Sequence, residues 1–186
     1  MGGLIDVLIP EAGQLWRAAL IGLVALVALL LEAAPMGTGA SALPSPDLML
    51  LVLGVAVVRR PDCVPIPLVF TLGLARDLIG DMPVGLGALT LIAAIEILRM
   101  RAPALSRAAL WLEGMTIAAV TLAMLAAQIV LMLIMLAQPP YLMDLVRQWV
   151  LTLAFWPLAV FVVRGVMGIR AAKTSAGAST GERYGP

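Results

Sequence analysis

Apolar runs long enough to cross a lipid bilayer are the feature that most constrains this chain. The segments from about Leu15 to Ala33, Ala108 to Leu136 and Leu145 to Ile169 each carry at most two charged residues. A helix of about 20 apolar residues crosses the roughly 30 Å hydrocarbon core of a membrane. Of the 186 residues, 62% are hydrophobic and 12% are charged, whereas a soluble domain is about half apolar and a quarter charged. The sequence therefore predicts an all-α integral membrane protein.

The second apolar segment opens with a helix start signal, Ser-Pro-Asp at positions 45–47. Ser45 can cap a helix, Pro46 suits the first helical position, and Asp47 favours the positive end of the helix dipole. Pro61 disfavours helical geometry at the residue before it. The predicted helix from Pro46 to Arg59 is about 21 Å long, so it is too short to cross the bilayer alone.

Two further short helices are predicted. One starts in the proline-rich stretch PDCVPIP and ends at Ile79, and the next runs from about Val84 to Arg99. We therefore expect six transmembrane helices in one membrane domain, residues 15–172, with the second and third forming a short antiparallel hairpin. Helices this short need longer neighbours or a locally thinned membrane. Residues 1–14 are expected to form a cytoplasmic segment and residues 173–186 a disordered cytoplasmic tail.

Basic residues are distributed unevenly between the predicted loops. If the N-terminus is cytoplasmic, two fall on the outside, Arg76 and Arg147, and nine fall on the inside: Arg17, Arg59, Arg60, Arg99, Arg101, Arg107, Arg164, Arg170 and Lys173. The positive-inside rule then predicts that both termini lie in the cytoplasm. The first apolar segment is longer than the core of a usual signal peptide and follows acidic residues, so we expect it to be a retained span.

The stretch LGLARDLIGDMPVGLGAL places a carboxylate at a helix end. Asp77 lies in the last turn of the third helix, where a negative charge opposes the helix dipole and needs donors. Gly80 can end that helix in a left-handed conformation, and the turn containing Gly85 and Gly87 brings the free N–H groups of the next helix alongside. Gly73 permits close helix approach. Asp77 is predicted to hold the turn together, with an ion or proton site or a partner contact as alternatives.

Other polar residues have local interpretations. Arg76 and Asp77 are neighbours on a helix and point about 100° apart, so they do not face each other. Arg76 is expected to extend to the outer headgroups or to contact a protein partner. Glu96 and Arg99 are predicted to pair locally. Gln128, in mid-span, is predicted to hydrogen-bond to another helix or to contact a ligand.

Two features concern helix packing. Ala119, Ala123 and Ala127 repeat at four-residue spacing, which suits close packing against a helix of this chain or of a partner. Pro157, inside the last apolar segment, is expected to kink the helix.

The composition excludes several kinds of catalytic site. The chain has no histidine and one cysteine, Cys63, so a histidine metal site, a Ser-His-Asp triad, a Cys-His pair and an internal disulfide are excluded. Cys63 is expected to pack as a small apolar residue near a membrane edge, with a reactive thiol as the alternative. We predict no enzymatic activity, no cofactor or metal site and no nucleic-acid partner.

Three segments carry a resemblance to a known family: PSPDLMLLVLGVAVVRRPD, LGLARDLIGDMPVGLGAL and FWPLAVFVVRGV, in this order and at these separations. They resemble the bacterial rod shape-determining membrane protein MreD, from about Pro44 to Arg170. Arg76 departs from the pattern, because the position before the family's aspartate is commonly apolar.

The resemblance implies a non-enzymatic scaffold of the cell-elongation machinery in the bacterial inner membrane. Its implied partner is MreC. Through MreC, the scaffold would act with the elongation transpeptidase, which is a class B penicillin-binding protein, with RodA and, indirectly, with MreB filaments. The implied fold is similar to the six-helix fold of the substrate-binding subunits of vitamin transporters.

A solute-binding subunit of a vitamin (ECF-type) transporter is the alternative on the same fold. It would need an outward pocket lined by polar residues, for which the candidates are Asp47, Asp81, Tyr141, Asp144 and Arg147. An intramembrane enzyme is disfavoured because a nucleophile with a base partner is missing.

Overall fold

The computed structural model is all-helical in the parts of the chain that it describes, residues 12–33, 45–80, 83–105, 108–136 and 141–167. The helices are α1 (Ala12–Ala33), α2 (Leu48–Arg59), α3 (Ile66–Ile79), α4 (Leu86–Leu105), α5 (Leu110–Ile134) and α6 (Leu142–Met167), with a 3₁₀ turn, η1 (Pro61–Cys63), between α2 and α3. Segment 173–186, residues 1–11 of the predicted cytoplasmic segment and the predicted last-helix end at Ile169 lie outside the described residues.

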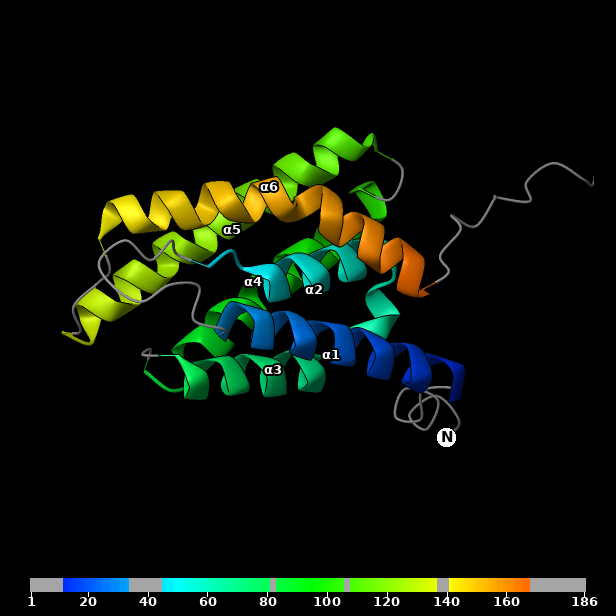
Figure 1. The fold of residues 1–186 in the computed structure, drawn as a ribbon, viewed down its shortest axis with the longest axis horizontal. Helices are drawn as coiled ribbons and strands as arrows, with labels where there is room; N and C mark the ends of the chain where they lie inside the picture. The colour runs from blue at the N-terminus through cyan, green and yellow to red at the C-terminus, as the bar shows by residue number, and fades with distance from the viewer. Residues whose placement is uncertain (1–11, 34–44, 81–82, 106–107, 137–140, 168–186) are drawn as a thin grey trace, which may run out of the picture.

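Successive helices run in alternating directions along the long axis of the molecule, so α1 begins and α6 ends at the same end (Figure 1). We call this end the Arg60 end and the opposite one, where α2 begins, the Asp47 end. Within the described ranges, three helices are long and apolar enough to cross a membrane, over Leu15–Ala33, Leu110–Ile134 and Leu142–Gly165. Their length and composition indicate a membrane-associated protein.

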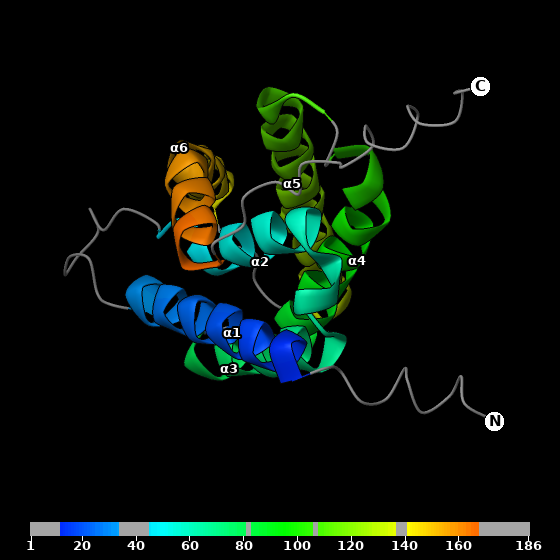
Figure 2. The ribbon, with the colours of Figure 1, turned by 90° about the vertical axis from the view of Figure 1, so that its right-hand side faces the viewer.

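Helix α2 lies at the centre of the bundle (Figure 2). Every residue from Met49 to Val58 is buried, and the helix packs against α1, α4 and α6. A helix buried all round carries no polar stripe, which explains why its sequence, LMLLVLGVAVVR, is apolar without periodicity.

The prediction that the second and third helices pack against each other as a hairpin is wrong. Helix α3 packs chiefly against α4 and also against α1, while α2 has its main contacts elsewhere. The reason is steric. A side-chain carbon at Gly73 would come within 2.7 Å of Ala88 Cα, so two small residues let the backbones of α3 and α4 approach more closely than ordinary side chains would allow.

Two predicted helix boundaries also need correction. The N-cap of α2 is Asp47, not Ser45, because the Asp47 carboxylate accepts a hydrogen bond from Leu50 N at 3.0 Å. Helix α4 does not end near Arg99 but continues to Leu105 through Pro103. Buried apolar side chains, including Leu105, hold this last turn, although Pro103 has no N–H group to donate to the preceding turn. Helix α6 also runs through a proline, Pro157, and Figure 1 shows it changing direction in its second half, as predicted.

Candidate functional site

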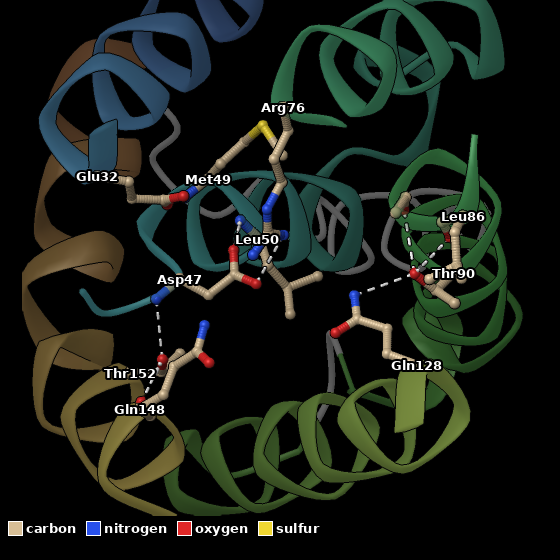
Figure 3. Close-up of polar contacts among 11 residues, drawn as sticks. Glu32, Asp47, Met49, Leu50, Arg76, Leu86, Thr90, Gln128, Gln148 and Thr152 are labelled. Atoms are coloured by element: carbon tan, nitrogen blue, oxygen red, sulfur yellow. Dashed lines mark hydrogen bonds and ion pairs between the residues drawn. The ribbon is translucent and has the colours of Figure 1, made fainter. Parts of the chain in front are cut away.

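A buried ion pair at the Asp47 end joins two motifs that the sequence places 29 positions apart. Arg76 Nη1 lies 2.8 Å from Asp47 Oδ2, with the two side chains 16% and 3% exposed. The Asp47 backbone N–H donates to Thr152 Oγ1 at 2.9 Å. The N-terminus of α2, the end of α3 and the middle of α6 therefore meet at one residue (Figure 3).

The predicted extension of Arg76 to the outer headgroups is wrong. The side chain points into the bundle, toward Asp47 (Figure 3). A guanidinium and a carboxylate in contact attract each other more strongly in a protein interior than in water. Arg76 therefore supplies a full positive charge beside the Asp47 carboxylate, which the N–H groups of the helix cap alone do not.

Glu32 adds a second carboxylate to this cluster. It lies in the last turn of α1 and is partly buried, and its Oε1 accepts a hydrogen bond from Met49 N at 2.6 Å. The free N–H groups at the start of α2 are thus shared between Asp47 and Glu32, which satisfies donors that a helix leaves unpaired. The sequence interpretation missed Glu32. The available signal was an acidic residue at the very end of a long apolar run.

Asp77 makes the contacts predicted from the turn. Its Oδ2 accepts hydrogen bonds from Gly85 N at 2.8 Å and from Ala88 N at 3.1 Å, and the residue is 2% exposed. The predicted left-handed cap at Gly80 is wrong, because its φ of −90° and ψ of 173° are extended. Its N–H nevertheless bonds the carbonyl of Arg76 at 2.9 Å. The left-handed glycine is instead Gly85, with φ of 94°.

Gly87 is required for the Asp77 contact. A side-chain carbon at position 87 would overlap Asp77 Oδ1, so only glycine lets the carboxylate reach the start of α4. Asp77 therefore joins α3 to α4 through a helix N-terminus, which favours the turn-holding role among the alternatives for this residue.

The Arg60 end has ion pairs of its own. Arg59 Nη2 lies 3.0 Å from Glu113 Oε2, a buried carboxylate in the first turn of α5. Arg99 pairs with Glu96 at 2.9 Å, as predicted, and also donates to the carbonyl of Pro61 at 2.8 Å. Arg99 thereby fixes η1 against α4. The sequence interpretation missed the Arg59–Glu113 pair, because it joins residues 54 positions apart.

Two further predictions concern residues of α5, namely Gln128 and the alanines at four-residue spacing. Gln128 Nε2 donates to Thr90 Oγ1 at 3.2 Å, so it makes the predicted hydrogen bond between helices, here α5 and α4 (Figure 3). Ala119, Ala123 and Ala127 are all exposed. Their surface is therefore open in the described chain, and a close-packing partner would have to come from outside it.

An apolar groove opens between α1 and α6, with α2 as its floor. Its volume is about 240 Å³, and all ten residues that line it are apolar, among them Val24 and Leu31 of α1, Leu48 of α2, and Leu158 of α6. The polar residues considered for an outward solute pocket do not gather around it. Asp47 is buried as the N-cap of α2, Asp144 and Arg147 form an exposed pair at 3.5 Å, and Tyr141 is 84% exposed. Asp81 lies outside the described residues.

The described residues hold no group of three or more Cys, Asp or Glu side chains placed to bind a metal ion. Comparisons with protein-family models, curated proteins and solved structures found no match.

Proposed function

We propose that this chain is a non-catalytic membrane scaffold of the bacterial rod-shape machinery, with the role of an MreD-type protein. It would bind MreC in the inner membrane and help to couple MreB filaments to lateral peptidoglycan synthesis by RodA and the elongation transpeptidase. The proposal starts from the resemblance of three sequence segments, and it is supported by what the charged residues of those segments do in the fold.

The observation that carries the proposal is that these charges are used for architecture. Asp47, Arg76 and Asp77 are the charged residues of the motifs that the structure describes at the Asp47 end. Each is held by an ion pair or by helix N–H groups inside the bundle. Intramembrane ionisable residues commonly mark substrate or ion pathways, but here they join α2, α3, α4 and α6. Such a cluster fits a rigid scaffold better than a transport site.

The groove supports the same conclusion. A site for a polar vitamin needs several polar groups that fix the orientation of the solute, whereas the α1–α6 groove is lined by apolar side chains alone. The surfaces that this protein offers inside a membrane therefore suit apolar partners, such as a transmembrane helix or lipid, more than a polar solute.

The distribution of charge supports a topology of six crossings with both termini in the cytoplasm. Among the described residues, the Arg60 end carries six arginines (Arg17, Arg59, Arg60, Arg99, Arg101 and Arg164) and three acids (Asp62, Glu96 and Glu113). The Asp47 end carries two arginines (Arg76 and Arg147) and four acids (Glu32, Asp47, Asp77 and Asp144). The positive-inside rule then puts the Arg60 end in the cytoplasm.

The test is depletion of the protein in its native cell, together with affinity purification of the intact chain from mild detergent. We expect rod-shaped cells to become round and MreC to co-purify. Ala123→Trp, on the exposed alanine face of α5, should weaken MreC recovery if small residues admit the MreC helix. Leu122→Trp, an exposed neighbour on the same helix, is the matched control. Unchanged cell shape with loss of vitamin uptake would overturn the proposal.

A further inference from the structure

Helix α3 lies at the edge of the bundle, beside α1 and α4 (Figure 2), and it is short. From Ile66 to Ile79 it extends about 20 Å along its axis, whereas the hydrocarbon core of a bilayer is about 30 Å thick. Helix α2 is also short, but it is buried at the centre of the bundle and needs no match to lipid. Helix α3 has an exposed apolar face, so its length has to be reconciled with the membrane around it.

An ion pair of α4 marks one edge of this face. Arg99 and Glu96 pair at 2.9 Å with side chains that are 26% and 36% exposed, and such charges belong at the boundary between hydrocarbon and water. Arg99 also donates to the carbonyls of Pro61 and Val64, just before α3 begins, so the charged level is common to both helices. From Arg99 back to Leu86, where α4 begins, is again about 20 Å.

The turn between α3 and α4 marks the other edge. By sequence it contains Asp81, which lies outside the described residues, and a charge held within hydrocarbon is costly. The charged residues of α3 itself are directed into the bundle, since Arg76 pairs with Asp47 and Asp77 is 2% exposed. The turn therefore belongs at the level of the headgroups, and the two edges of the α3–α4 face are about 20 Å apart.

The side chains on this face suit lipid more than a helix. Contacts between transmembrane helices are enriched in small residues, which let the backbones approach closely. Gly73 and Ala88, however, are buried against each other between α3 and α4. The large side chains that are exposed on the two helices are Ile66, Phe70, Leu78, Ile79, Leu89 and Ile97.

We propose that lipid acyl chains cover the α3–α4 face and that the bilayer thins beside it, from about 30 Å of hydrocarbon to about 20 Å. Thinning is one of the ways in which a bilayer accommodates a short apolar stretch. Helix α5 makes no such demand, because it has no charged residue from Gly114 to Ile134, which is about 30 Å. The protein would therefore join a thin and an ordinary stretch of membrane across its own width. This inference rests on the proposed topology of six crossings.

The test measures the depth of spin labels at the two ends of α3. The full chain with Cys63→Ser carries a single label at Ile66→Cys or Ile79→Cys, both at exposed positions, in vesicles of dioleoylphosphatidylcholine. Power saturation with oxygen and a nickel chelate gives the depth of each label below the edge of the hydrocarbon. In a thinned bilayer the two depths should sum to about 0 Å, whereas a flat bilayer would give about 10 Å.

A matched pair on α5 calibrates the depth scale. Met115→Cys and Ile134→Cys are also at exposed positions, about 29 Å apart along the helix, where the bilayer needs no thinning. The topology is checked separately with a maleimide that does not cross membranes. Asp62→Cys at the Arg60 end and Tyr141→Cys at the Asp47 end, both exposed, should react from opposite sides of sealed vesicles.

The possible failures are distinguishable. Reaction of positions 62 and 141 from the same side would overturn the topology and the thinning together. Reaction from opposite sides with a summed depth of about 10 Å at α3 would overturn the thinning alone and leave the scaffold role standing. Cross-linking of a partner's transmembrane helix to Phe70→Cys in the native cell would overturn the assignment of this face to lipid.

Discussion

Replacing Arg76 with methionine should destabilise the folded bundle by about 3–5 kcal/mol, the usual effect of removing one partner of a buried ion pair. The size follows from the surroundings of the pair. Asp47 is 3% exposed and lies 2.8 Å from the guanidinium, and Glu32 is bonded to the same helix end. Methionine roughly preserves the apolar volume of the arginine but leaves two carboxylates at this end with only helix N–H groups to stabilise them.

The measurement is equilibrium unfolding of the purified protein in mixed micelles, followed by tryptophan fluorescence. Arg147→Met is the control, because its pair with Asp144 is exposed and 3.5 Å long, and it should change the free energy of unfolding by less than about 1 kcal/mol. Asp47→Asn keeps an oxygen that can cap α2. The double variant Asp47→Asn with Arg76→Met should therefore lose less free energy of unfolding than the two single variants lose together, by about 1–3 kcal/mol. Equal effects of Arg76→Met and Arg147→Met would refute this reasoning.

Three further outcomes follow from the structure. Gly87→Ala should destabilise the protein by more than about 1 kcal/mol, because the new methyl group overlaps the Asp77 carboxylate. The control Gly165→Ala has open space around it and should be neutral or stabilising by up to about 1 kcal/mol. Thermal unfolding of the two variants measures the difference. Burial raises the pKa of the Cys63 thiol, so at pH 8 the reactive thiolate is scarcer than in a free cysteine. Maleimide should label it far more slowly in the folded than in the unfolded chain, and equal rates would contradict the buried position. Gln128→Leu should cost about 0.5–1.5 kcal/mol by removing a hydrogen bond between helices, measured by the same unfolding assay.

Contacts within one turn were predictable from the sequence. Asp77 and its donors at Gly85 and Ala88 are at most 11 positions apart, and an acid at a helix C-terminus followed by a glycine-rich turn has few other ways to find donors. The error at Gly80 is of a different kind. A helix can end with an extended residue as well as with a left-handed one, and the sequence does not distinguish the two at a glycine.

Contacts that depend on helix stacking were not predictable. The partner of Arg76 is at the start of α2 and that of Glu113 is at its end, so both pairs require knowing that α2 lies at the centre of the bundle. The predicted hairpin failed for the same reason. Sequence order puts α3 next to α2, but the close approach of Gly73 and Ala88 gives α3 a better neighbour in α4.

The position of α2 has a consequence for how the protein is made. This helix has twelve residues, or about 18 Å at its usual rise, little more than half the thickness of the hydrocarbon layer. During synthesis it leaves the ribosome before α4 and α6, two of the three helices that pack around it. In the proposed topology of six crossings, the insertion machinery would therefore not release α2 into lipid as an independent unit. It would hold the growing chain, or admit α1 and α2 as a pair, until α4 and α6 have been made.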